Sequence, residues 1–287
     1  MHLNKALTGI VLLFVPIFLL AQSGKVSDNL SLPSKILNGD RKYGIYFPPD
    51  YASSERNYPV LYLLHGSGDD QTGWIQFGEV MHIADKAIRE GKATPMIIVM
   101  PDANTGKKGY FNSINGDWLY EDFFFKEFMP YIENKYRIKK DKHYRAISGL
   151  SMGGGGTFMY ALRHPELFSA AAPLSASVGP VNLEDAKLIY KRNSPEATDE
   201  QIEAYYNRHS TVALIKAMDE ADKNKVRWYI DCGDDDRLSV GNAYAHIAMM
   251  EKQISHEFRI RDGGHNWTYW RASLPKVLEF ITVSFHQ

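Results

Sequence analysis

The stretch Arg145-Ala146-Ile147-Ser148-Gly149-Leu150-Ser151-Met152-Gly153-Gly154-Gly155-Gly156 decides the fold of this 287-residue chain. The run from Tyr144 to Ser148 is typical of a strand, and the residues from Gly153 to Arg163 have a helical pattern. Glycines on both sides of Ser151 permit a sharp turn, because a Cβ at those positions would collide with neighbouring backbone. The stretch therefore predicts a strand, a tight turn and a helix in direct succession.

The same alternation of strands and helices continues on both sides of this stretch. Short apolar runs predict further strands at 60–64, 96–100, 170–174, 226–230 and 257–260. Helical patterns lie at 78–90, 122–136, 153–163, 243–254 and 274–285. Nearly continuous apolar strands are covered on both faces, as they are in parallel sheets. The sequence thus predicts an α/β fold, with a mostly parallel, doubly wound sheet and flanking helices.

The domain organisation follows from what interrupts this alternation. We find no internal repeat and no Pro/Gly/Ser-rich linker, so residues 24–287 are expected to form a single domain. The segment 182–225 is polar, with weak helical periodicity, and is long for a connection inside a compact domain. We interpret it as a small cap-like insertion over the functional site. A surface excursion without contact to a ligand is the alternative.

The N-terminal residues resemble a targeting signal. Lys5 precedes an uncharged apolar run from Ala6 to Ala21, and Ala21 and Ser23 give a small-x-small cleavage pattern. We therefore expect a signal peptide over residues 1–23, with export to a periplasm or the exterior and no stable membrane insertion after cleavage. An uncleaved membrane anchor is the alternative, although the run is slightly short for a bilayer. Cys232 is the only cysteine, so no intrachain disulfide can form.

The charge balance excludes one class of partner. Lys and Arg total 33 against 34 for Asp and Glu, and the formal net charge is −1. Without a basic excess or a Lys/Arg-rich run, the chain lacks the electrostatic footprint that nucleic-acid binding needs. We expect no nucleic-acid partner, and the sequence does not indicate an oligomeric state.

The turn at Ser151 has the pattern G-x-S-x-G, which places a serine between a strand and a helix. Such a turn lifts the serine Oγ clear of the sheet and predicts Ser151 as a nucleophile. The backbone N–H of Met152, at the start of the helix, is then free to donate to a developing oxyanion. The four glycines from Gly153 to Gly156 weaken the helix, so we expect them to serve close packing of helix on strand.

The other parts of an acyl-transfer site also follow predicted strands. The backbone N–H of Ser67, in the His65-Gly66-Ser67-Gly68 loop, is the expected second oxyanion donor, and His65 is expected to brace that loop. His265 lies in a glycine-flanked loop after the last strand, where a general base could reach the serine. An acid should lie between them in sequence, and Asp234, Asp235 and Asp236 all fit that place.

These residues resemble the esterase family of the α/β-hydrolase superfamily that includes feruloyl and acetylxylan esterases (carbohydrate esterase family one). Esterase D-type S-formylglutathione hydrolases and mycolyltransferases are more distant relatives. The matching segments are Tyr62 to Gly66, Asp69 to Trp74, Ile98 to Asp102, Arg145 to Gly154, Ile230 to Asp236 and Gly263 to Trp267. The resemblance covers nearly everything from about Ser31 onward. It implies an α/β-hydrolase fold and serine esterase activity.

Carried onto this chain, the family pattern implies Ser151 as nucleophile and His265 as base. Its Gly-x-x-Asp pattern implies Asp236 as the acid, with Asp235 as the fallback. The oxyanion donors fall on the backbone of Ser67 and Met152. Relatives often carry a larger apolar residue where this chain has Ser67.

The resemblance and the export signal together predict the substrate class. We expect hydrolysis of a small acyl ester, feruloyl or acetyl, on a plant polysaccharide such as xylan, with no cofactor and no metal ion. Trp74, Trp118 and Trp267 are candidates for stacking on a sugar or a phenolic acid. An S-formylglutathione-hydrolase-like thioesterase, a siderophore esterase or an acyltransferase would share the same parts. A non-catalytic carbohydrate-binding relative is the alternative from a different class.

Overall fold

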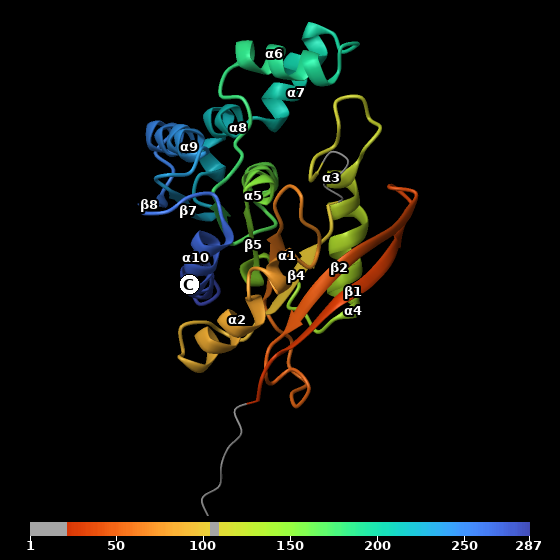
Figure 1. Cartoon of the computed structure of the whole chain (residues 1–287), viewed down its shortest axis with the longest axis vertical. Helices are drawn as coiled ribbons and strands as arrows, with labels where there is room; N and C mark the ends of the chain where they lie inside the picture. The colour runs from red at the N-terminus through yellow and green to blue at the C-terminus, as the bar shows by residue number, and fades with distance from the viewer. Residues whose placement is uncertain (1–21, 104–108) are drawn as a thin grey trace, which may run out of the picture.

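An eight-stranded sheet organises the computed structural model, which describes residues 22–103 and 109–287. The strand order is β1-β2-β4-β3-β5-β6-β7-β8 (Figure 1). The strands are β1 (Lys25–Ser34), β2 (Gly39–Phe47), β3 (Val60–Leu64), β4 (Ile97–Pro101), β5 (Arg145–Leu150), β6 (Ala170–Leu174), β7 (Arg227–Gly233) and β8 (His256–Arg261). Strands β3 to β8 pair in parallel, which confirms the predicted α/β fold. β1 and β2, which the apolar runs did not predict, add an antiparallel edge.

Helices connect the strands and cover the sheet. They are α1 (Gly73–Gln76), α2 (Val80–Arg89), α3 (Tyr120–Phe123), the π-helical turn η1 (Phe124–Phe128), α4 (Met129–Lys135), α5 (Met152–Arg163), α6 (Leu183–Asn193), α7 (Asp199–His209), α8 (Thr211–Ala217), α9 (Ser239–Glu251) and α10 (Trp267–Ser284), with short 3₁₀ turns η2 (Lys142–Tyr144) and η3 (Glu220–Asp222). α10 begins at Trp267 rather than at the predicted Leu274. Its start is fixed by Asn266, whose side chain accepts a hydrogen bond from the N–H of Tyr269.

Two apolar cores lie on opposite faces of the sheet. Successive side chains of a strand point to opposite faces, so Tyr62 and Leu64 belong to one core while Leu61 and Leu63 belong to the other. The first core packs against α3, α4, α5 and α9, and the second against α2 and α10. Burial on both faces explains why β3 to β7 are nearly continuous apolar runs.

The segment 182–225, predicted as a cap-like insertion, forms α6, α7 and α8. α7 begins with a capping box in which Thr198 and Gln201 exchange hydrogen bonds. In Figure 1, α6 and α7 stand at one end of the molecule, while α8 lies against α9 nearer the sheet. Tyr205 of α7 donates a hydrogen bond to the carbonyl of Asn112, 2.9 Å away, which ties α7 to the segment before α3.

The predicted signal segment, residues 1–23, lies almost entirely outside the described residues. Among residues 22–103 and 109–287, no helix combines the length and the apolar character that crossing a membrane requires.

Candidate active site

The turn between β5 and α5 holds Ser151 in a strained backbone conformation, with φ of 55° and ψ of −115°. The glycines around it are required by close contacts. A Cβ on Gly149 would lie 2.6 Å from the carbonyl oxygen of Gly153, and a Cβ on Gly153 would lie 2.6 Å from that of His65. The predicted strand–turn–helix unit is therefore present, with the serine at its apex.

The glycine run continues this close packing into the first turns of α5. A Cβ on Gly154 would lie 2.7 Å from the carbonyl oxygen of Leu174, and one on Gly156 would lie 3.0 Å from a methyl group of Leu64. α5 is thus pressed against the ends of β3 and β6. This contact confirms the predicted reason for four successive glycines.

A chain of hydrogen bonds joins Ser151, His265 and Asp236. The Oγ of Ser151 lies 2.9 Å from Nε2 of His265, and Nδ1 of His265 lies 2.8 Å from Oδ2 of Asp236. A carboxylate only accepts hydrogen bonds, so Nδ1 carries the proton and Nε2 faces the hydroxyl as an acceptor. Asp236 is buried, and its other oxygen accepts a 2.8 Å hydrogen bond from the N–H of Leu238.

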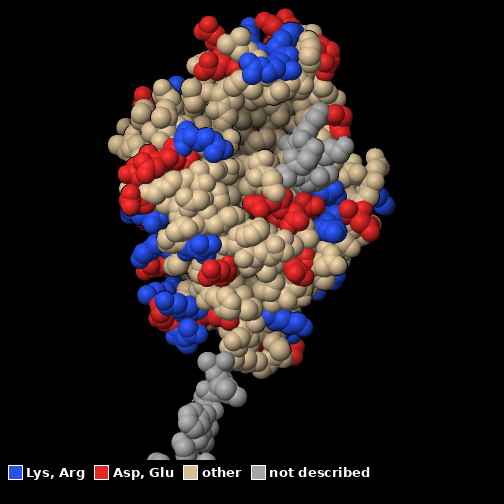
Figure 2. Space-filling model, in the orientation of Figure 1, with Lys and Arg blue, Asp and Glu red and all other residues tan. Residues whose placement is uncertain are grey.

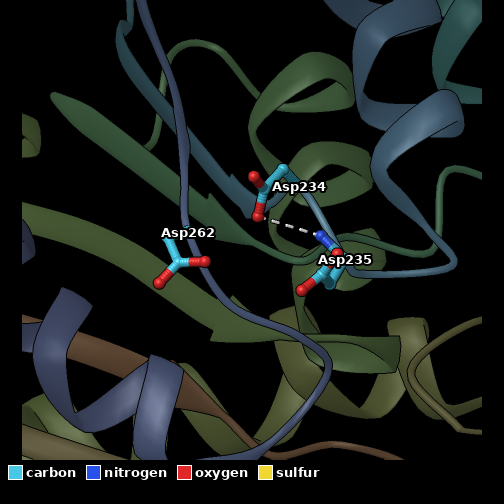
Figure 3. A group of neighbouring side chains, drawn as sticks. All are labelled: Asp234, Asp235 and Asp262. Atoms are coloured by element: carbon cyan, nitrogen blue, oxygen red, sulfur yellow. Dashed lines mark hydrogen bonds between the residues drawn. The ribbon is translucent and has the colours of Figure 1, made fainter.

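The neighbouring acids have other surroundings. Asp234 and Asp235 are exposed and form a cluster with Asp262, in which one carboxylate oxygen from each lies within 4.8 Å of the others (Figure 3). The Oδ1 of Asp234 accepts hydrogen bonds from the N–H groups of Asp235 and Gly263 and shapes the loop. Of the three adjacent acids, Asp236 is the one that is both buried and hydrogen-bonded to His265. Asp235, the fallback choice, is exposed instead.

Asp231, within β7, is fully buried and stabilises the fold. Its carboxylate accepts hydrogen bonds from the guanidinium of Arg261 at 2.9 and 3.0 Å, and from the hydroxyls of Tyr229 and Tyr269. The group joins β7, β8 and α10 just below the loops that carry Asp236.

Replacing Asp231 by alanine is expected to lower the free energy of unfolding by about 3 kcal/mol, because Arg261, Tyr229 and Tyr269 all lose their acceptor. Urea unfolding measures the change. Asp262→Ala, which removes an exposed carboxylate close by, is the control and should change the free energy by no more than about 0.5 kcal/mol. Equal effects of the two substitutions would contradict the structural role of Asp231.

The loop after β3 passes beside Ser151. A Cβ on Gly66 would lie 3.5 Å from Cβ of Ser151, so the backbone next to Ser67 is close to this serine. The N–H of Met152 lies at the first position of α5, where a helix leaves its N–H groups free. Both predicted donors are therefore on segments that adjoin the serine.

His65 braces this loop, as expected. Its Nδ1–H donates to the carbonyl of Gly66 at 2.9 Å, and its Nε2 accepts from the N–H of Ala103 at 3.0 Å. This arrangement needs a neutral imidazole, and burial lowers the pKa of His65 in agreement with that state. The brace ties the end of β3 to the end of β4.

Two residues hold His265 in position, and the sequence analysis identified neither of them. The ring of Trp270 meets the imidazole edge-to-face, with centroids 5.0 Å apart, and its indole N–H donates to Oγ of Ser175 at 3.0 Å. Trp270 lies on the buried side of α10, one turn after the loop that carries His265. The short sequence distance between His265 and Trp270 could have indicated Trp270. The helix was predicted to begin only at Leu274, so Trp270 was not recognised as part of it.

The three tryptophans proposed as substrate contacts differ in their surroundings. Trp74 is fully buried and donates its indole N–H to the carbonyl of Leu64, so its prediction as a substrate contact is wrong and it is a packing residue. Trp118 is nearly buried and donates to the carbonyl of Gly109. Trp267 is half-buried and packs edge-to-face on Trp74, which leaves it the most accessible of the three.

Cys232 is not an alternative nucleophile. It lies buried in β7, and burial, together with the negative charges of Asp236 and Asp231, raises the pKa of its thiol to about 12. The thiol therefore stays protonated at neutral pH, and a protonated thiol is a poor nucleophile.

A groove of about 730 Å³ lies between α5 and the helices α6 and α7. Gly155 and Ser177 belong to its lining, and their N–H groups donate to the carbonyl of Ser151 at 3.0 and 2.9 Å. Its other walls are mostly apolar or aromatic and include Phe111, Met159, Val178, Leu188, Ile189 and Tyr190. In Figure 2, the end of the molecule formed by α6 and α7 carries many charged side chains, and the surface just below it is mostly uncharged and drawn in tan. The segment 182–225 thus forms one wall of a groove whose lining includes two residues that are hydrogen-bonded to the backbone of Ser151.

The sheet, the strained serine turn and the histidine in contact with it define an α/β-hydrolase. The Esterase family model matches residues 34–281, and the chain belongs to this family of carboxylic ester hydrolases.

Three relatives illustrate the similarity. The chain is 33% identical over 177 residues to an endo-1,4-beta-xylanase/feruloyl esterase of Xylanibacter ruminicola, covering 56% of this chain and 24% of that protein. It is 30% identical over 248 residues to an esterase of Mycobacterium tuberculosis, covering 77% of this chain and 51% of that protein. The chain thus spans about a quarter of the first of these relatives and about half of the second. A solved ferulic acid esterase superposes with a TM-score of 0.80 at 39% identity, covering 92% of this chain and 99% of that one.

Proposed function

We propose that the chain is a serine carboxylesterase in which Ser151, His265 and Asp236 act as nucleophile, general base and orienting acid. The observation that carries this proposal is the continuous pair of hydrogen bonds from the Ser151 hydroxyl through His265 to the buried Asp236. The serine stands at the N-terminus of α5, at the apex of the strained turn after β5. Carboxylic ester hydrolysis is the chemistry that this arrangement suits best.

In the first step Nε2 of His265 accepts the hydroxyl proton while Oγ of Ser151 attacks the ester carbonyl. The resulting oxyanion is stabilised by the backbone N–H groups of Met152 and Ser67. The imidazolium, held by Asp236, returns its proton to the departing alcohol oxygen, which leaves an acyl-serine. Water then attacks the acyl-serine by the same route and releases the acid. Protons balance in each step, and no cofactor takes part.

We propose an aromatic acyl ester of a plant polysaccharide, such as a feruloyl ester, as the substrate. The 39% identity to a ferulic acid esterase and the similarity to a xylanase/feruloyl esterase support this class. The apolar groove beside Ser177 adds support, because its 730 Å³ is far more room than an acetyl group needs. A polysaccharide is too large to enter a cell, so the proposal agrees with the predicted export.

A panel of esters tests this function. We expect kcat/KM for methyl ferulate to exceed that for acetylated xylan, and both to exceed that for a glutathione thioester. Preference for the acetyl ester would reject the feruloyl proposal, and preference for the thioester would favour the S-formylglutathione-hydrolase-like alternative. Turnover of none of the three, with no labelling by a fluorophosphonate, would favour the non-catalytic relative.

Ile189→Asp tests the contribution of the groove. Ile189 lines the groove on α6 with 44% of its surface exposed. We expect kcat/KM for methyl ferulate to fall about tenfold through lost apolar contact, with little change for the acetyl ester. Val283→Asp, at a residue of α10 that is 42% exposed and outside the groove, is the matched control. An equal loss for both esters, or in both variants, would contradict the proposed binding mode.

A further inference from the structure

Helix α9 carries an apolar stripe on its outer side. Val240, Tyr244, Ile247 and Met250 are spaced so that they share one side of the helix, and all four are exposed. The inner side, which includes Ala245, packs on the sheet. An exposed apolar surface that continues over three turns of a helix marks a site where another surface packs.

The strand next to this helix, β8, is an open edge of the sheet. The carbonyl of Arg261 accepts from the N–H of Asp234, so the backbone groups of Arg261 point toward β7. Because these directions alternate along a strand, the N–H and C=O groups of Phe258 and Ile260 point away from the sheet. In agreement, the carbonyl of Phe258 accepts a hydrogen bond from the side chain of Arg259 rather than from a strand. The edge thus offers a row of backbone groups to a further strand.

The charges on β8 are self-complementary. Glu257 and Arg259 flank Phe258, are both exposed, and point to the face of the sheet that α10 covers. If two copies of β8 pair in antiparallel fashion with Phe258 opposite Phe258, Glu257 of each copy lies opposite Arg259 of the other. The same register places His256 opposite Ile260 on the α9 face. A second copy of this chain is therefore the partner that the edge suits.

The spacing of the helices agrees with this pairing. α9 packs across β7 and β8. In a sheet that continues across two copies of β8, the two α9 helices lie about two strand spacings apart, or about 10 Å. This is the distance at which two helices pack against each other. The two apolar stripes would then cover one another across the two-fold axis.

We propose that the chain forms a symmetric dimer through antiparallel pairing of β8 with β8 and packing of α9 on α9. The interface is isologous, as two-fold symmetry requires, because each copy presents the same strand and the same stripe. Neither the stripe nor β8 contributes a residue to the lining of the groove between α5 and the helices α6 and α7. This dimer is independent of the substrate proposed above.

Sedimentation velocity combined with light scattering tests the dimer on the full folded domain. Wild-type protein should show about twice the mass of one chain. Glu257→Arg and Arg259→Glu each place like charges opposite one another twice per interface, and each should shift the mass toward that of the monomer. The double variant E257R/R259E restores both pairs and should restore the dimer. Lys187→Glu, which breaks an exposed ion pair on α6, is the control and should leave the mass unchanged.

A second pair of variants tests the stripe. Ile247 is 49% exposed on α9, and Ile247→Glu should yield monomer with unchanged esterase kcat/KM, which shows that the fold is intact. Ile189→Glu, at the similarly exposed residue on α6, should remain dimeric. A monomeric wild type would overturn the proposal. A dimer that survives Ile247→Glu and both single charge reversals would overturn it as well, because its interface would lie elsewhere.

Discussion

Ser151→Ala is expected to lower kcat for methyl ferulate by at least about four orders of magnitude, because the reaction loses its nucleophile and the acyl-enzyme cannot form. The Ser151 hydroxyl is the one that lies 2.9 Å from Nε2 of His265 at the start of α5. The substitution removes a single oxygen atom and does not change the glycines of the turn. The melting temperature should therefore change little. Steady-state hydrolysis with the purified domain measures the loss.

Ser67→Ala is the matched control for this experiment. Ser67 is exposed, and the proposal uses its backbone N–H rather than its hydroxyl. The same serine-to-alanine change should therefore keep kcat close to that of the wild type. If Ser151→Ala retained wild-type turnover, or if Ser67→Ala were equally damaging, Ser151 would not be the nucleophile.

Asp236→Asn is expected to lower kcat by about 10⁴-fold while leaving the fold intact. The asparagine amide would donate to Nδ1 of His265, so the imidazole proton would move to Nε2. The nitrogen that faces the Ser151 hydroxyl at 2.9 Å would then be a donor and could not accept the proton. The shape of the side chain is unchanged, and an amide oxygen can still accept from the N–H of Leu238.

Asp235→Asn is the comparison that decides the acid. Asp235 is the adjacent residue, it is exposed, and it lies in the cluster with Asp234 and Asp262. We expect its replacement to change kcat by less than about threefold, as for an exposed charge without a direct contact. A large loss in Asp235→Asn with little effect of Asp236→Asn would reverse the assignment.

The strand–turn–helix unit at Ser151 could be predicted because its causes are local. Gly149 is needed for a contact with Gly153 in the same turn, and β5 is buried on both faces, so its apolar run is continuous. The order of Ser151, the acid and His265 along the chain could also be predicted, since each follows a strand. The choice among the adjacent acids could not be made from physics alone, because it depends on which carboxylate the folded loop buries.

Other features depend on packing that the sequence does not display. β1 and β2 lie at an antiparallel edge, where buried and exposed positions mix and no long apolar run marks the strands. Trp74 lies near the active-site loops in sequence, yet its ring is buried beneath them. Trp270 and Ser175 meet only in the folded chain, across 95 positions of sequence. Helix α6 is polar on average, yet it contributes the apolar residues Leu188 and Ile189 to the groove. The average polarity of the segment gave no indication of this apolar contribution.

The most direct test of the central claim is to locate the covalent adduct of a fluorophosphonate probe by peptide mass spectrometry. The account predicts one adduct per active site, on the peptide that contains Ser151, and a much slower reaction after His265→Ala. An adduct on a different residue that accompanies complete loss of esterase activity, or full inhibition with Ser151 unmodified, would contradict it.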